Sequence, residues 1–229
     1  MDKNQLKLER ITDTLSVYQK SGVFCYGTDA VLLADYVKKS VKTLSGKHMC
    51  DLCSGTGIIP LLLCDADNSI MCDAIEINRD ACEISEMSAD YSGYSDRFQV
   101  KNIDIKDVKN HYQSEQFDFL TCNPPYMTAN CGRMCEDDYK TIARHEVLCN
   151  INDVFAAAFY LLRTGGSIFI VYRSDRLSSL FKAAHDNRFE IKRMAAVVSK
   201  PLPSVIKLVI CEAKKDGNEG LVLEGLKIN

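Results

Sequence analysis

After Gly46, short apolar runs alternate along the chain with segments in which apolar residues recur at helical spacing. The apolar runs predict strands at residues 48–53, 70–77, 98–103, 117–122, 167–172, 191–198 and 205–213. Helices are predicted between them at residues 58–64, 79–91, 151–162 and 176–185. Strands that alternate with helices form a parallel sheet with helices on both faces. We therefore expect an α/β fold.

Two regions depart from this alternation. The last two predicted strands are separated only by the sequence KPLPS, which predicts an antiparallel pair at one edge of the sheet. Before the first strand, residues 28–39 predict an amphipathic helix with Thr28 as its N-cap. The length of 229 residues and the hydrophobic content of 46% indicate one domain.

Composition limits the partners and the cellular compartment expected for this protein. The net charge of −3 and the pI of about 5.8 give no overall signal for nucleic-acid binding, although a local basic patch is compatible with them. The N-terminus lacks the apolar core of a secretory leader, and no apolar run approaches the ~20 residues of a membrane span. We expect a soluble cytoplasmic protein with free, mostly buried thiols. The Cys50/Cys53 and Cys131/Cys135 spacings lack further zinc ligands, so no metal is expected.

The first predicted strand ends in DLCSGTG, where Gly55 and Gly57 let the backbone turn tightly and approach a ligand. A dinucleotide fingerprint requires a third glycine, but Pro60 stands at that position, so the motif alone is a weak signal. Glu76 ends the second strand and can accept hydrogen bonds from a ribose diol. The glycine turn and the acid together predict a cofactor that contains a nucleoside.

At the third strand end, Ile103 is placed to pack on the base of that nucleoside, and Asp104 to accept from its exocyclic amine. Asp104 is equally compatible with a turn or N-cap role.

The fourth strand ends in the sequence Asn123-Pro124-Pro125-Tyr126. Amino groups attached to π systems are poor nucleophiles, and a site can activate one by accepting hydrogen bonds from both N–H groups. The Asn123 side-chain oxygen and the Pro124 carbonyl are two such acceptors, which the rigid prolines hold in place. The Tyr126 ring can stack on a planar substrate. The alternative interpretation is a simple turn that ends the strand.

These motifs, together with FCYGTDAVLLADYV near the start, ARHE at 143–146, LLRTGGSIFIVYRSDRL and the late Lys200-Pro201, carry a family resemblance. The chain resembles class I S-adenosylmethionine-dependent methyltransferases of the NPPY group, and more narrowly the tRNA1(Val) adenine-37 N6-methyltransferase family. The resemblance implies a Rossmann-like, seven-stranded, mostly parallel sheet with an antiparallel edge strand. It implies a single domain with a pocket-covering segment (1–46), a cofactor-binding catalytic core (47–213) and a short C-terminal tail (214–229).

The resemblance also implies the residues of the site. The S-adenosylmethionine contacts would be Asp51, Cys53, Ser54, Gly55, Gly57, Glu76, Ile77, Ile103, Asp104 and Asn123. The RNA substrate, a tRNA, would be contacted by Tyr26, Asp29, Arg144, His145, Arg173 and Lys200. For the basic residues, a salt-bridged turn or a solvated charged face is an alternative.

Other activities fit parts of the pattern. Glutamine N5-methylation of a protein poses the same nucleophilicity problem, but only about 46 residues precede the first strand, which leaves little room for the helical N-terminal domain usual in such enzymes. DNA adenine methylation is less favoured, because a target-recognition domain does not fit in 229 residues. A nucleotide-binding oxidoreductase or an inactive binding module is opposed by the missing third glycine and by the NPPY sequence.

Overall fold

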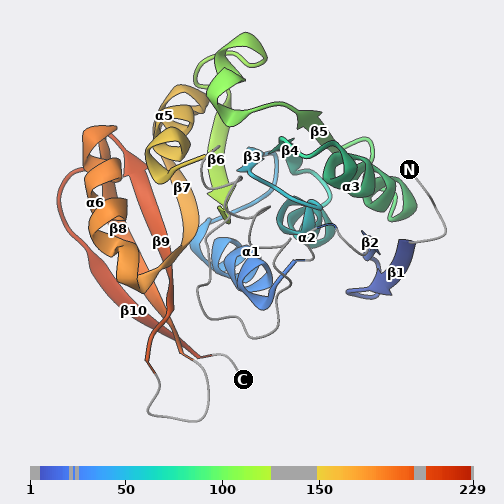
Figure 1. Ribbon diagram of the computed structural model, residues 1–229, viewed down its shortest axis with the longest axis horizontal. Coiled ribbons are helices and arrows are strands. Elements are labelled where there is room, and N and C mark those ends of the chain that lie inside the picture. The colour runs from blue at the N-terminus through green and yellow to red at the C-terminus, as the bar shows by residue number, and fades with distance from the viewer. Residues whose placement is uncertain (1–5, 21–22, 24–25, 125–148, 199–204, 228–229) are drawn as a thin grey trace, which may run out of the picture.

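A mixed sheet forms the centre of the molecule. The computed structural model describes residues 6–20, 23, 26–124, 149–198 and 205–227. Within these residues eight strands join one sheet in the order β10-β8-β9-β7-β6-β3-β4-β5 (Figure 1). The strands are β3 (His48–Leu52), β4 (Met71–Glu76), β5 (Phe98–Asn102), β6 (Phe117–Cys122), β7 (Leu162–Arg173), β8 (Phe189–Val198), β9 (Leu208–Lys215) and β10 (Val222–Lys227).

Helices cover both faces of this sheet, which confirms the predicted α/β fold. Successive residues of a strand point to opposite faces, and the two apolar clusters of the core divide in this way: Cys50 and Leu52 belong to one, Met49 to the other. The first cluster includes side chains of α5 (Ile151–Leu161), α6 (Leu177–Asp186) and the 3-10 helix η2 (Ile105–Asn110). The second includes side chains of α1 (Thr28–Ser40), α2 (Ile58–Ala66) and α3 (Arg79–Tyr91).

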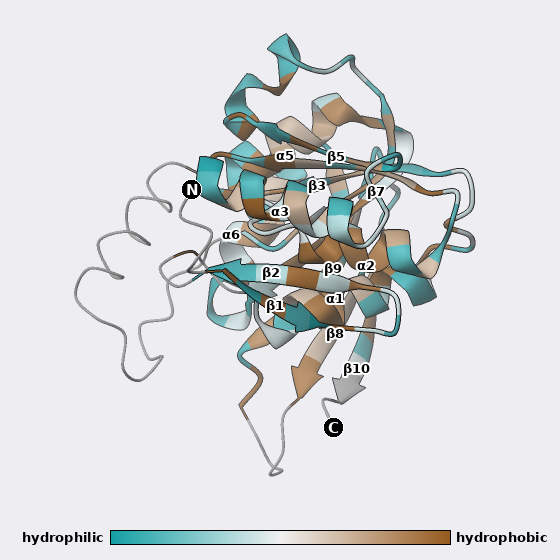
Figure 2. Cartoon of the chain, turned by 90° about the vertical axis from the view of Figure 1, so that its right-hand side faces the viewer, coloured by the Kyte–Doolittle hydropathy of each residue, from teal (hydrophilic) through white to brown (hydrophobic). Residues whose placement is uncertain are grey.

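The helices α2 and α1 differ in how well their sequences predict them. α2 is apolar along most of its length and brown in Figure 2, because the residues from Ile58 to Cys64 are all buried. α1 begins at Thr28, but its N-cap is Gly27 and makes no side-chain capping bond, so the predicted cap at Thr28 is wrong. The short 3-10 helix η3 (Ser174–Arg176) links β7 to α6.

The order of the last strands corrects the predicted sheet. β9 is antiparallel to both β7 and β8, as the KPLPS connection indicated, but it lies between them and not at an edge. The edge strand on this side of the sheet is β10, which runs parallel to β8 and makes the strand count eight instead of seven. β10 falls in the segment expected to be a tail. Its residues Val222 and Leu223 are exposed, so the strand lacks the buried apolar pattern that identified the others.

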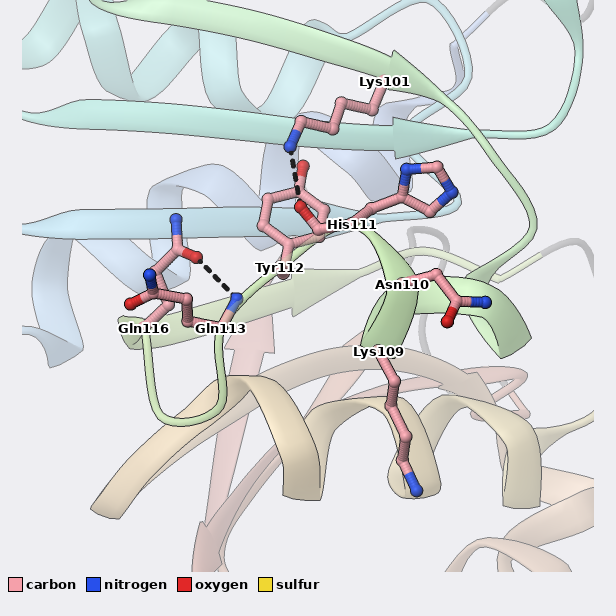
Figure 3. Close-up of a pocket in the computed structure, with 7 residues that line it drawn as sticks. All are labelled: Lys101, Lys109, Asn110, His111, Tyr112, Gln113 and Gln116. Atoms are coloured by element: carbon pink, nitrogen blue, oxygen red, sulfur yellow. Dashed lines mark hydrogen bonds between the residues drawn. The ribbon is translucent and has the colours of Figure 1, made fainter.

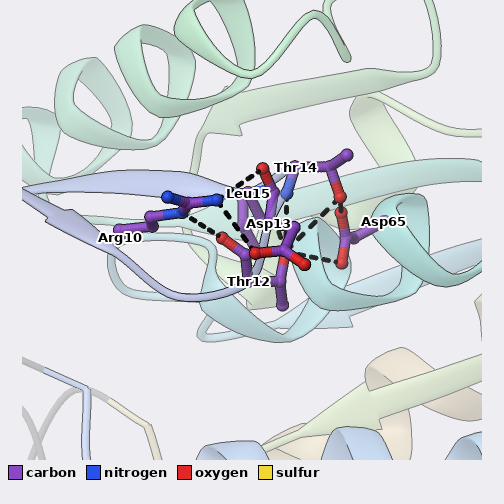
Figure 4. A network of polar contacts seen from close by, with 6 residues as sticks. All are labelled: Arg10, Thr12, Asp13, Thr14, Leu15 and Asp65. Atoms are coloured by element: carbon purple, nitrogen blue, oxygen red, sulfur yellow. Dashed lines mark hydrogen bonds and ion pairs between the residues drawn. The ribbon is translucent and has the colours of Figure 1, made fainter.

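The N-terminal residues form a separate hairpin of β1 (Leu6–Arg10) and β2 (Ser16–Lys20), which the sequence did not predict. Its turn is fixed to the end of α2, because Asp65 accepts hydrogen bonds from Thr12 Oγ1 at 3.0 Å and Thr14 Oγ1 at 2.5 Å (Figure 4). Leu15 fills the apolar space beneath the turn and is fully buried. The hairpin therefore packs against α2 and the second apolar cluster.

The described cysteines are free, and most are buried, as expected. Cys50 lies inside β3, whereas Cys53 faces Cys149, so the CxxC spacing does not pair its own two thiols. Cys131 and Cys135 lie outside the described residues. In the described part of the chain, no helix combines the length and the apolar character needed to cross a membrane.

Candidate active site

The carboxyl ends of β6, β3 and β4 lie side by side in the sheet. From β3 the chain continues to β4 and β5 on one side, and then returns to β6 on the other side. Such a reversal of strand order opens a crevice at the carboxyl ends of the strands, where open α/β sheets bind ligands. The predicted site residues Asp51, Glu76 and Asn123 come from the ends of β3, β4 and β6.

The turn after β3 contains two glycines in the left-handed region, with φ of +55° at Gly55 and +76° at Gly57. Their surroundings differ. A Cβ on Gly57 would lie 2.1 Å from Ser85 Oγ of α3, whereas a Cβ on Gly55 would meet nothing within 4 Å. Gly57 therefore lets the turn pack against α3, and Gly55 leaves open space into which a ligand can approach the backbone.

Glu76 is held by this turn and by the next one. Its Oε2 accepts from the Gly55 N–H and its Oε1 from the Asn78 N–H, both at 2.8 Å. The Asn102 side chain donates to the carbonyls of Glu76 and Ile77 and so joins the ends of β4 and β5. Each carboxylate oxygen has a further acceptor position. The fixed carboxylate can thus accept from two hydroxyl groups of a ribose.

Asp51 is fully buried in β3, where Thr121 Oγ1 of the neighbouring β6 donates to its Oδ1 at 2.5 Å. Its Oδ2 is buried and has no hydrogen-bond partner among the described residues. Burial raises the pKa of Asp51 to about 8, the bond from Thr121 lowers it and the charge of Glu76 raises it further. Asp51 is therefore a buried acid with one unpaired oxygen near the end of β3.

Asn123 follows β6, and only the nitrogen of its side-chain amide has a hydrogen-bond partner among the described residues. Nδ2 donates to Asp29 Oδ2 at 3.1 Å, while Oδ1 is buried and lacks a partner in the described part of the chain. Asp29 belongs to the first turn of α1. Pro124 is buried next to it. This arrangement presents a hydrogen-bond acceptor, Oδ1, to whatever group enters the site.

The other predicted site residues make capping, packing or ion-pair contacts within the chain. Asp104 caps η2 by accepting from the Lys106 N–H at 2.9 Å, which is the N-cap role left open above. Ile103 packs against the core, whereas Ile77 is 41% exposed. Arg173 at the end of β7 forms an ion pair with Asp175 at 2.6 Å. Tyr26 packs beside the cluster that contains α1. The predicted residues Pro125, Tyr126, Arg144, His145 and Lys200 lie outside the described residues.

Thiols lie close to the site. Cys53 Sγ and Cys149 Sγ are 3.8 Å apart. A hydrogen bond with Cys122 raises the pKa of Cys53 well above its usual value, and burial raises the pKa of Cys122. These thiols are therefore protonated at neutral pH and do not provide a thiolate nucleophile.

An open hollow beside the amino end of β6 does not contain the predicted site (Figure 3). Lys101 Nζ donates to the His111 carbonyl at 3.0 Å and lies 3.9 Å from the centre of the Tyr112 ring. This lysine is thus occupied by contacts within the chain. The lining of the hollow is polar, but the strand-end residues of the predicted site are not part of it.

The fold and the strand-end site place the chain among the Rossmann-like methyltransferase folds. A predicted O-methyltransferase from Agrobacterium tumefaciens superimposes with a TM-score of 0.68 at 18% identity, over 87% of this chain and 86% of that one. The 16S rRNA methyltransferase RsmC of T. thermophilus, in complex with AdoMet and guanosine, has a TM-score of 0.63 at 16% identity, over 92% of this chain and 50% of that one.

The sequence profile of the methyltransferase small domain family matches residues 14–185, and the chain belongs to this family. Among curated proteins, the tRNA1(Val) (adenine(37)-N6)-methyltransferase of Porphyromonas gingivalis is 29% identical over 76% of this chain and 69% of the relative. The protein of the same name from Parabacteroides distasonis is 28% identical over 86% of this chain and 82% of the relative. These matches confirm the methyltransferase resemblance.

The described residues fit S-adenosylmethionine. Buried oxygens of Asp51, Ser54 and Asn123 lack partners in this part of the structure. Buried polar groups are almost always paired, so three unpaired atoms at the ends of the neighbouring strands β3 and β6 indicate a polar ligand. The open space over Gly55 and the fixed carboxylate of Glu76 suit its ribose.

Sequence reasoning did not assign the supporting contacts made by the Thr121 and Asn102 side chains and by the Asn78 N–H, because each acts on a neighbouring strand or turn. Thr121 lies in β6, two residues before Asn123, but only the strand register places it opposite Asp51.

Proposed function

We propose that this protein methylates the exocyclic N6 amine of adenine in RNA with S-adenosylmethionine, and that its substrate is adenine 37 in the anticodon loop of a valine tRNA. The observation that carries the proposal is the anchored Asn123 amide, whose buried Oδ1 is free to accept from an amine. The names of the curated relatives support the choice of base and RNA.

Residues of the chain would hold the cofactor as follows. Glu76 would accept from the ribose hydroxyls, and the turn at Gly55 would approach the cofactor through its backbone. Asp51 and Ser54 would receive its polar groups with their unpaired oxygens. When bound, S-adenosylmethionine supplies a methyl group on a positively charged sulfur.

Asn123 and Pro124 act on the amine. The adenine N6 lone pair is delocalised into the ring, so it is a poor nucleophile. Hydrogen bonds from both N–H groups to the Asn123 Oδ1 and the Pro124 carbonyl would favour a tetrahedral nitrogen, with its lone pair localised. Because the acceptors are held before the substrate binds, this is catalysis by preorganisation. Anticodon-loop bases are weakly stacked, so moving one into the site costs little.

The test is transfer of labelled methyl groups to unmodified valine tRNA, followed by mass spectrometry of the nucleosides. We expect N6-methyladenosine, and we expect the signal to disappear when adenine 37 is replaced by guanine. The Asn123→Ala variant should lose about 10²–10³-fold in kcat, as for the loss of one preorganised hydrogen-bonding group. Asn110→Ala, an exposed asparagine in η2, is the matched control and should keep full activity.

Two results would contradict the proposal. The first is the absence of incorporation into any tRNA by the unaltered protein. The second is incorporation into protein glutamine in a cell extract but not into RNA, which would identify the amide substrate considered above.

A further inference from the structure

We propose that Asp29 is a positioning residue that fixes the orientation of the Asn123 amide, so that Oδ1 and not Nδ2 faces the target amine. The inference rests on the proposed function. It gives Asp29 a role different from the substrate contact expected from sequence, because its carboxylate would act through Asn123.

The need for such a residue follows from the shape of an asparagine side chain. A half turn about its last bond exchanges Oδ1 and Nδ2 while leaving the shape almost unchanged. In one orientation Asn123 offers an acceptor to the amine; in the other it offers N–H groups, which would meet the N–H groups of the amine. Packing alone hardly distinguishes the two, so a polar neighbour has to do so.

Asp29 is suited to this task because an ionised carboxylate only accepts hydrogen bonds. It accepts from Asn123 Nδ2 at 3.1 Å, and the reversed amide would place Oδ1 against the negative charge. Charge-assisted hydrogen bonds are strong enough to favour one orientation by roughly 10–100-fold. The active orientation is thereby present before any substrate binds.

The chain also holds Asp29 itself in place. Leu33, Ala34 and Val37 of the same helix are fully buried against the sheet. Asp29 lies in the first turn of α1, where the helix dipole favours a negative charge. Gly27 leaves room for the carboxylate, since a Cβ at Gly27 would lie 2.3 Å from Asp29 Oδ1. The φ of −99° at Gly27 is open to any residue, so glycine is needed there for space and not for backbone conformation.

A spectroscopic test examines the orientation without substrate. In the 15N-labelled protein, the side-chain amide signals of Asn123 are those that vanish in Asn123→Ala. We expect them to shift in Asp29→Ala and in Gly27→Ala, where a methyl group displaces the carboxylate. The control Asp35→Ala removes another acid of α1, which pairs with Lys38 at 2.5 Å, and should leave the signals unchanged. Unchanged signals in Asp29→Ala would overturn the inference.

Kinetics supply the second readout. We expect Asp29→Ala to lower kcat by about 10–100-fold, with KM for RNA and the affinity for S-adenosylhomocysteine within about twofold of the unaltered protein. Asp29→Asn should recover part of the loss, because an amide oxygen can still accept from Asn123. A raised KM with unchanged kcat would show that Asp29 contacts RNA, and would overturn the inference. If the unaltered protein transfers no methyl group to RNA, the proposed function fails, and the amide signals still decide the role of Asp29.

Discussion

Gly55, Gly57 and Gly46 share a left-handed backbone but differ in what surrounds them. Gly57 touches α3, whereas the space around Gly46 and Gly55 is open. An alanine at either open position would have the same backbone strain and no clash. Gly46 lies before β3, away from the strand-end crevice, so these two glycines separate the cost of strain from the loss of a ligand contact.

We expect Gly55→Ala and Gly46→Ala to destabilise the protein equally, by about 1–2 kcal/mol, the cost of left-handed backbone for a residue with a Cβ. Only Gly55→Ala should weaken S-adenosylhomocysteine binding, by about tenfold or more, since its methyl group occupies the open space. Chemical unfolding and calorimetric titration measure the two effects. Equal affinities for the two variants would rule out a cofactor contact at Gly55.

Asp51 makes stability depend on pH. Folding raises its pKa from 3.8 to about 8, so the folded protein binds this proton more tightly than the unfolded chain. The resulting stabilisation is complete below about pH 4 and is lost as the pH rises towards 8. Without cofactor, the free energy of unfolding should therefore fall relative to Asp51→Asn, on the order of 1 kcal/mol per pH unit in this range.

Urea unfolding of both proteins at several pH values from about 5 to 8 checks this prediction. Asp13→Asn, at a fully exposed aspartate, is the control and should follow the unaltered protein. A constant difference between Asp51→Asn and the unaltered protein across the range would show that Asp51 is ionised throughout.

Several polar contacts hold the N-terminal hairpin to the helices. Besides bonds from the two threonines of the hairpin turn, Asp65 accepts one from the Tyr94 hydroxyl at 2.5 Å. It thus joins the hairpin and α2 to the connection between α3 and β5. The hairpin is also bound to α3 itself, since the Tyr18 N–H donates to Ser88 Oγ and the Ser16 N–H to Ser92 Oγ. Loss of Asp65 would leave three hydroxyl groups without their common acceptor.

Asp65→Ala should destabilise the protein by about 1–3 kcal/mol and speed hydrogen exchange of the amides of β1 and β2 more than those of β3 and β6. The control Asp13→Ala removes an exposed acid of the same turn and should change exchange little. If exchange accelerated equally in hairpin and sheet, the hairpin would not be an element that opens separately.

The site strands were predictable, whereas the hairpin and the last edge strand were not. β6 lies where the sequence predicted it, and the ends of β3 and β4 differ by one residue, because buried parallel strands are continuous apolar runs. β5 was also placed to within one residue, although it is mostly part-exposed. β1, β2 and β10 are mostly part-exposed and lack this signal. The contact between Asp29 and Asn123 joins residues 94 positions apart and depends on how α1 packs, which no local pattern specifies.

At the scale of the whole molecule, the two apolar clusters share their strands. Alternate residues of β7 point to opposite faces, with Ile168 and Ile170 in one cluster and Phe169 and Val171 in the other. Damage to either face should therefore weaken the same sheet.

Phe155→Ala in α5 and Leu33→Ala in α1 remove side chains from opposite faces. We expect costs of about 3–5 and 2–5 kcal/mol, and a single unfolding transition for each variant by both near- and far-ultraviolet circular dichroism. Phe181→Ala, at a phenylalanine that is 42% exposed, is the control and should have a small effect. Separate transitions in the two wavelength ranges would show that unfolding is not a single cooperative event, against a sheet shared by both faces.

The position of β9 has a consequence for synthesis on the ribosome. β7 and β8 leave the ribosome before the strand that lies between them, since β9 begins only at Leu208. Until then, both have unpaired edges open to other chains. β3 to β7, whose carboxyl ends surround the proposed active site, pair without β9. A nascent chain can thus assemble its catalytic crevice early, while the last strands protect the molecule from aggregation.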